Sequence, residues 1–113
     1  MQISKIQKVI IVGLFSIVSL GINAAEYTIE QQEKQFVKDG KLIEKMTVNV
    51  GDTIHFRNQD PWFHNVFSLS DIKTFDLGSY PKGESKAVVF DKAGMAEVEC
   101  AIHPQMFMEI EVK

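Results

Sequence analysis

Cysteine is almost absent from this chain, in which Cys100 is the only one. An intramolecular disulfide is therefore impossible, and a c-type haem, whose attachment motif contains two cysteines, is excluded. A single thiol is by itself as often a buried, inert side chain as a functional one. The role of Cys100 therefore has to be inferred from the residues around it.

Positive charge is also scarce, with 12 Lys and Arg against 15 Asp and Glu. Nucleic acid is not expected as a partner of such a chain, because phosphate binding depends on clustered basic side chains. The sequence contains no recognisable nucleophile–base pair and no paired-carboxylate motif. We therefore expect a protein that is not an enzyme.

A hydrophobic run long enough to span a bilayer is missing. The longest, 9–20, is shorter than the ~20 residues of a spanning helix. Lys5 and Lys8 precede this run and the small residues Ala24 and Ala25 follow it, which is typical of a secretory signal peptide. We expect a signal peptide at 1–24 and one domain at 25–113, located in the periplasm without a membrane anchor. Cleavage after Ala24 or after Ala25 would fit, and an uncleaved anchor is the alternative.

The exported domain would carry 10 basic and 15 acidic residues, a net charge of −5. A domain of this size buries little apolar area and often depends on a metal or a disulfide for stability. Since a disulfide is excluded, a metal is the natural candidate.

Helical periodicity is weak after residue 25, and short alternating apolar segments separated by turn residues dominate. Only 31–45 stays open between helix and loop, with Phe36 and Val37 as expected core residues. The pattern predicts an all-β sandwich or barrel. The expected strands lie around 27–29 and at 46–50, 54–56, 66–69, 87–90, 95–100 and 107–112, with a loop at 78–83.

The segment from Cys100 to Met106 contains a thiol, the imidazole of His103 and a thioether within one short loop between two expected strands. His64 stands at the start of another expected strand, 36 residues before Cys100, and strand ends can meet at one end of a sandwich. Soft sulfur ligands favour copper, and two His with one Cys and a weak axial Met make an electron-transfer copper site. Zinc, in contrast, usually takes four strong ligands.

These residues resemble the cupredoxin family, in particular its amicyanin and plastocyanin-like members of the methylamine-utilisation type. The resemblance covers roughly 46–113: the block 51–60 is similar to the family's Gly-Asp strand, His64-Asn65 to its first His-Asn, and Cys-x-x-His-x-x-Met to its C-terminal loop. It implies a cupredoxin-like Greek-key β-sandwich with one type 1 copper ion. The implied ligands are His64, Cys100, His103 and Met106.

Three further positions matter in this resemblance. Asn65 would tie the ligand loop to the strand beside His64, an outer contact of the kind that fixes ligand direction. Relatives commonly have proline where this chain has Ile102, which leaves the redox potential open. Met108 has the longer plastocyanin-like spacing and is the alternative to Met106 as axial ligand. If Met106 is the ligand, Met108 is expected only to pack in a strand.

The function expected from this resemblance is single-electron transfer by a periplasmic blue copper protein, a monomer that meets redox partner proteins transiently. The alternative is a copper chaperone or storage protein with the same ligands and no electron traffic. A fragment of a copper oxidase or reductase would need more histidines, and only His55 remains unassigned. A domain that has lost its metal is disfavoured by the intact ligand set.

The remaining candidates have plainer interpretations. His55 lies between two apolar residues of a strand and should point away from the core. Met46 and Met95 follow strand patterns and are expected in the core. Apolar side chains flank the expected ligands, either as packing or as a rim through which His103 meets a partner: Pro61, Trp62, Phe63 and Pro104. Four alternating glutamates are expected on a solvated face: Glu97, Glu99, Glu109 and Glu111.

Overall fold

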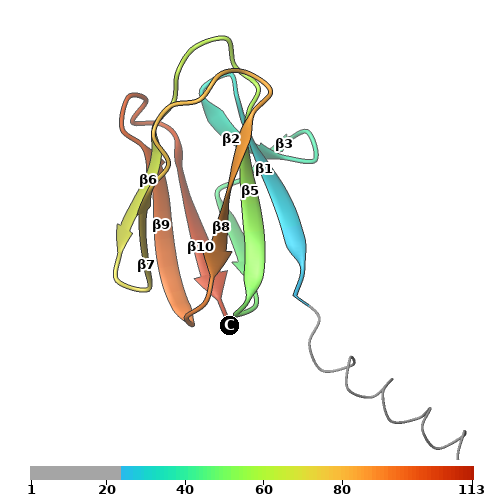
Figure 1. Ribbon diagram of the computed structural model, residues 1–113, viewed down its shortest axis with the longest axis vertical. Helices are drawn as coiled ribbons and strands as arrows, with labels where there is room; N and C mark the ends of the chain where they lie inside the picture. Colours follow the sequence, from blue (N-terminus) through green and yellow to red (C-terminus); the bar gives the residue numbers. More distant parts are fainter. Residues whose placement is uncertain (1–23) are drawn as a thin grey trace, which may run out of the picture.

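Residues 24–113 are described by the computed structural model, and they form ten β-strands in two sheets (Figure 1). The expected signal peptide lies outside the described residues, apart from Ala24. Within 24–113 there is no helix with the length and hydrophobicity needed to cross a bilayer.

The first sheet has the strand order β3-β2-β1-β5-β8 and the second the order β4-β10-β9-β6-β7. The first contains β1 (Glu26–Gln32), β2 (Gln35–Lys38), β3 (Lys41–Leu42), β5 (Asp52–Asn58) and β8 (Ser85–Phe90). The second contains β4 (Lys45–Val48), β6 (Val66–Ser70), β7 (Lys73–Asp76), β9 (Gly94–Cys100) and β10 (Phe107–Val112).

Most neighbouring strands run antiparallel, but β1 pairs with β5 and β10 pairs with β4 in parallel. Because parallel neighbours cannot be joined by a tight hairpin, the chain has to cross from one sheet to the other between them. It does so after β3, β4, β5, β7 and β8. The all-β sandwich predicted from the sequence is confirmed.

Alternation along the strands builds the core between the sheets. In β5, Ile54 and Phe56 are fully buried, whereas His55 and Arg57 lie on the outer face. In β10, Met108, Ile110 and Val112 point inward in the same way. Each strand thus contributes every second side chain to one apolar layer, which is the expected consequence of a two-residue period.

The segment 31–45 is neither a helix nor a loop: it continues β1 and forms the hairpin with β2, followed by β3 and the start of β4. Phe36 and Val37 are buried, as expected. Glu33 and Lys34 take left-handed backbone angles at the tip of the hairpin. This turn was not predicted, because two-residue turns of this kind usually contain Asn or Gly and this one consists of Glu33 and Lys34.

The ends of the strands determine where the site lies. The β5–β6 loop and the β9–β10 loop both lie at the upper end of the sandwich in Figure 1, whereas β1 and β5 begin and β10 ends at the lower end. Functional side chains on these two loops therefore share one end of the molecule.

Candidate metal centre

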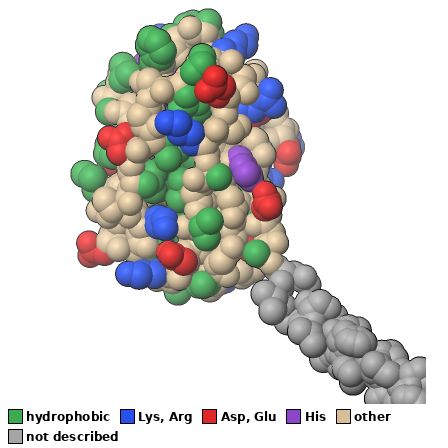
Figure 2. Space-filling view, in the orientation of Figure 1, with side chains coloured by type: hydrophobic (Ala, Val, Ile, Leu, Met, Phe, Trp, Pro, Cys, Tyr) green, Lys and Arg blue, Asp and Glu red, His purple; other side chains and the backbone are tan. Residues whose placement is uncertain are grey.

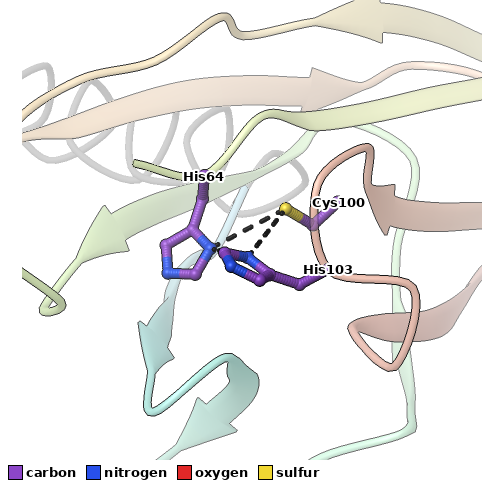
Figure 3. Close-up of side chains that lie close together, drawn as sticks. All are labelled: His64, Cys100 and His103. Carbon is purple, nitrogen blue, oxygen red and sulfur yellow. Dashed lines mark hydrogen bonds between the residues drawn. The ribbon is translucent and has the colours of Figure 1, made fainter. Parts of the chain in front are cut away.

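Three potential metal donors converge at the upper end of the sandwich (Figure 3). The Sγ atom of Cys100 lies 3.7 Å from Nδ1 of His64 and 3.6 Å from Nδ1 of His103. The two imidazole Nδ1 atoms are 3.0 Å apart. One sulfur and two nitrogen atoms from distant parts of the chain thus face a common point.

The size of this triangle fits a metal ion. A point in its plane lies about 2.0 Å from all three atoms, which is close to the metal–imidazole bond length of ~2.0–2.1 Å and slightly under the ~2.3 Å of a metal–thiolate bond. Two imidazoles and a thiolate are the strong donors of an electron-transfer copper site. The donor set and its spacing therefore fit copper without rearrangement of these side chains.

Strand pairing in the second sheet brings the donors together. Cys100 is the last residue of β9 and pairs with Val66 at the start of β6, so His64 arrives beside the sulfur just before β6 begins. The backbone N–H of Ala101 donates to the carbonyl of Asn65 at 3.1 Å and extends this pairing into the loop. His103 follows in the same loop, and its carbonyl accepts a hydrogen bond from Met106 N–H at 2.9 Å.

Both candidate axial methionines are buried and belong to the core cluster. Met106 lies level with Cys100, because the Cys100 N–H donates to the Met106 carbonyl at 3.2 Å. Met108 pairs with Val98 instead. It therefore lies two residues, roughly 7 Å, further along the strand from the donor triangle.

His64 is held by a buried carboxylate. Its Nε2 lies 2.6 Å from Oδ2 of Asp60, and the two side chains are 1% and 3% exposed. A carboxylate can only accept, so Nε2 carries the hydrogen, and in the neutral ring the lone pair is on Nδ1. This is the nitrogen that faces Cys100, as a metal ligand requires.

Asp60 also connects the site to the β1–β2 hairpin. Its Oδ1 accepts the backbone N–H of Glu33 at 2.6 Å, and its Oδ2 accepts that of Lys34 at 3.1 Å. Burial raises the pKa of Asp60, but the hydrogen bonds from Lys34, His64 and Glu33 outweigh it, so the pKa lies below its ordinary value. The carboxylate therefore stays ionised at neutral pH.

Asp60 was not among the residues expected at the metal site. The one hint in the sequence is its position four residues before the expected ligand His64, and aspartate is common in such turns for other reasons. The contacts with Glu33 and Lys34 could not be anticipated, because they depend on the unrecognised hairpin.

Asn65 was expected to tie the ligand loop to the strand, and it does so through its backbone. Its N–H points to the Cys100 sulfur at 3.4 Å, and its carbonyl accepts Ala101 N–H. The side chain points elsewhere and donates to Asp76 at 2.6 Å. Hydrogen bonds from Gly78 N–H and from Asn65 lower the pKa of Asp76.

His103 is the more accessible of the two imidazoles, since it is partly exposed whereas His64 is buried. Desolvation, followed by the nearby His64 and Lys34, lowers the pKa of His103. Apolar side chains of the same loops are strongly exposed: Trp62 is 42%, Phe63 63% and Ile102 53% exposed. Hydrophobic side chains also stand at the upper end of the molecule in Figure 2.

The other candidates lie apart from the donor triangle. His55 faces outward, as expected, and its Nε2 lies 2.7 Å from a carboxylate oxygen of Glu26. Met46 packs against the core, as expected, but Met95 is exposed, so its predicted core position was wrong. Ala96 takes the inward position in this part of β9.

Fold and donor set together define a copper-binding β-sandwich. A family model described as copper binding proteins of the plastocyanin/azurin family matches residues 25–113. The chain belongs to this family, the cupredoxins, and its cofactor is one copper ion, for which His64, Cys100 and His103 form a suitable donor group.

Individual relatives agree with this assignment. The chain is 34% identical over 68 residues to the methylamine utilization protein MauL of Methylorubrum extorquens, a match that covers 59% of this chain and 60% of MauL. Among solved structures it is similar to the copper(I) form of an amicyanin variant, with a TM-score of 0.67, 18% identity and coverage of 85% and 88% of the two chains.

A copper-containing nitrite reductase of Thermus scotoductus SA-01 superposes with a TM-score of 0.68 and 21% identity, but the match covers 81% of this chain and 23% of the reductase. At these identities the structural matches establish the shared fold.

Proposed function

We propose that the protein is an electron carrier with a type 1 copper site, for which His64, Cys100 and His103 would supply the strong donors and Met106 a weak thioether donor. The observation that carries this proposal is the convergence of two Nδ1 atoms and one Sγ atom within 3.0–3.7 Å. When bound, copper supplies the one-electron couple. One electron enters from a reduced partner and one leaves to an oxidised partner, and no atom is transferred.

The chain's contribution is to hold its donors in one geometry. His64 is fixed on its far side by Asp60, and Cys100 is fixed by its position at the end of β9 and by the Asn65 N–H. Rigid donors reduce the rearrangement that accompanies a change of charge. Met106 is preferred over Met108 because its backbone is level with Cys100.

The exposed apolar rim supports transient contact with redox proteins. Trp62, Phe63 and Ile102 lie on the two loops that contain the donors, and His103 on one of these loops is partly exposed. A small, apolar contact centred on His103 would bring a partner close to the metal without forming a stable complex. We expect the protein to act as a monomer.

The proposed location is the periplasm, reached by means of a signal peptide at 1–24. The names MauL and amicyanin attach to relatives, and methylamine oxidation is one pathway in which this chain could act.

The decisive experiment is to add copper(II) to the purified domain and to record visible and EPR spectra. We expect an intense blue thiolate-to-copper absorption and a narrow copper hyperfine splitting. Cys100→Ser should lose the blue band because no thiolate remains. A blue band that persists in this variant would contradict the proposed ligands.

The axial ligand is tested by Met106→Ala and Met108→Ala, made separately. Met106→Ala should change the EPR spectrum and the reduction potential, because the weak axial donor tunes this couple. Met108→Ala should mainly lower the free energy of unfolding by roughly 2–5 kcal/mol, as for other buried methionines. If the EPR spectrum and the reduction potential change in Met108→Ala and not in Met106→Ala, Met108 is the axial ligand.

Electron transfer is distinguished from copper storage by the rate of electron self-exchange, measured by NMR line broadening in mixtures of the two oxidation states. A carrier should exchange rapidly and retain copper against a chelator. Slow exchange together with easy loss of copper(I) would favour the storage or chaperone function.

A further inference from the structure

At the opposite end of the sandwich from the metal centre, the backbone of Ala25 contacts a buried carboxylate. Asp52, at the start of β5, is 1% exposed. Its Oδ1 accepts the backbone N–H of Ala25 at 2.8 Å, and its Oδ2 accepts the N–H of Asn49 at 2.8 Å. Ala25 is held on both sides, because its carbonyl accepts the N–H of Thr53 at 3.0 Å.

Asp52 has no cationic partner within the described part of the chain. The ion pairs found in 24–113 involve other carboxylates, those of Asp39, Glu26, Asp60 and Asp91. Each carboxylate oxygen of Asp52 accepts one backbone N–H group, and a positive charge on one of these donors would strengthen the contact, because a charge-assisted hydrogen bond is stronger than a neutral one. The atom that lies at 2.8 Å from its Oδ1 is the nitrogen of Ala25.

We propose that export processing cuts the chain between Ala24 and Ala25 and that Asp52 is the built-in receptor for the new N-terminus. Water and an endopeptidase of the export machinery are the co-reactants. The carbon–nitrogen bond between the two alanines breaks, the hydroxyl of water joins the Ala24 carbonyl carbon, and hydrogen joins the Ala25 nitrogen. The Ala24 end leaves as a carboxylate, and the Ala25 amine takes up a proton at neutral pH.

Cleavage at this bond keeps both backbone contacts of Ala25 and adds a positive charge. The same nitrogen that donates as an amide then donates as an ammonium, which converts the hydrogen bond to Asp52 into an ion pair. Cleavage one bond later would remove Ala25 and with it both the donor to Asp52 and the acceptor of Thr53. The sequence is compatible with cleavage after Ala24 or after Ala25, and the contacts of Ala25 favour cleavage after Ala24.

The proposal is independent of the metal centre. Asp52 is the first residue of β5, which begins at the lower end of the sandwich in Figure 1, and the donor triangle lies beyond the other end of this strand. Six residues of extended strand separate Asp52 from Asn58, roughly 20 Å. Copper spectra should therefore be the same whichever way the N-terminal experiments turn out.

The first experiment is to express the full chain in a bacterium with an export system and to measure the intact mass of the processed protein. We expect a chain that begins at Ala25. A chain that begins at Glu26 or at any other residue, or that keeps the leader, would overturn the proposal.

The second experiment compares two purified forms, one beginning at Ala25 and one beginning at Ala24. The extra residue moves the ammonium about 3.8 Å along the chain and returns the Ala25 nitrogen to an amide. In urea unfolding of the copper-free protein, we expect the folding equilibrium constant to be roughly tenfold larger for the Ala25 form. Equal constants would overturn the proposed ion pair.

Asp52→Asn provides the control, because it removes the charge and keeps one of the two acceptor oxygens in both N-terminal forms. In this background the two forms should differ by less than about twofold. If Asp52→Asn does not fold, NMR titration of the α-amino group in the two wild-type forms replaces it. A pKa that is higher in the Ala25 form supports the ion pair, and equal values reject it.

Discussion

Asp60 is the residue whose importance only the structure reveals. It bonds to Nε2 of His64 and to two backbone N–H groups of the β1–β2 hairpin, so one carboxylate orients a proposed copper ligand and closes a turn. Carboxylate–histidine contacts of this kind fix the tautomer and direction of a metal ligand. Removing the charge should therefore weaken the site without removing any metal ligand.

Asp60→Asn is expected to lower copper affinity by about 10- to 100-fold, because an amide holds His64 less firmly than a carboxylate. Competition with a chromophoric chelator measures this change. Asp39→Asn is the control, since Asp39 is exposed and its backbone angle suits asparagine. Equal affinities of the two variants would show that the His64 contact does not matter.

Tyr80 is a second residue with a measurable signature. Its hydroxyl donates to the carbonyl of Phe56 at 2.7 Å and accepts from Gln31 at 2.9 Å. Desolvation raises its pKa to about 12 from 10.0, although the hydrogen bond from Gln31 opposes the rise.

Because the folded pKa of Tyr80 is the higher one, the unfolded chain loses this proton first as the pH rises. The stabilisation is complete below about pH 10 and is lost between about pH 10 and 12, by roughly 2 kcal/mol. Urea unfolding across this range should show the decline. Tyr80→Phe, less stable at neutral pH, should show a shallower decline, and an unchanged slope would contradict the assignment.

At the scale of elements, the start of β9 packs closely against the β6–β7 turn, and this contact restricts position 94 to glycine. Gly94 begins β9 with a backbone φ of +140°, and a Cβ placed there would lie 2.6 Å from Cγ2 of Ile72, in the β6–β7 turn. That methyl group sits on a branched carbon and has little freedom to move away. Glycine is therefore required both by the backbone angle and by the neighbouring side chain.

Gly94→Ala is expected to lower the free energy of unfolding by about 2–3 kcal/mol, through backbone strain and overpacking against Ile72. Chemical denaturation provides the measurement. Gly40→Ala is the matched control: its φ is also positive, at +79°, but its Cβ would meet no atom within 4 Å. If Gly40→Ala lowers the free energy of unfolding as much as Gly94→Ala does, the contact with Ile72 is not the cause of the destabilisation.

For the whole molecule, the proposed copper ion links three segments that meet only at one end of the sandwich: the loop before β6, the end of β9 and the β9–β10 loop. A ligand that binds only the folded state stabilises it in proportion to the logarithm of its concentration over Kd. Copper should therefore contribute to the stability of this small domain as well as to its function.

Adding copper at about 100 times its Kd is expected to stabilise the domain by ~2.7 kcal/mol, or to raise Tm by roughly 10–20 °C. Differential scanning calorimetry with and without copper measures this shift. Cys100→Ser, which lacks the thiolate, should show a much smaller shift. An equal shift in the variant would indicate that the metal binds elsewhere.

Strand alternation predicted an all-β sandwich or barrel, and the resemblance to the cupredoxins reduced this to a sandwich and pointed to His64, Cys100 and His103 as ligands. Strand alternation is a local property that burial of one face imposes on neighbouring residues. The short loop spacing keeps Cys100 and His103 together in any fold. The β1–β2 hairpin escaped prediction because its turn has neither Asn nor Gly. The position expected for Met95 was wrong, because Met95 shares the two-residue register of Glu97 and Glu99 and therefore lies on their solvated face.

Tertiary structure alone decided what meets these residues from distant strands. The pairing of β6 with β9 brought His64 to the sulfur, and the β1–β2 hairpin supplied two donors to Asp60. The same holds for Asp52 and Ala25, which the parallel pairing of β1 with β5 brings together. Such contacts depend on strand order and register, which arise from packing the whole chain rather than from any local pattern.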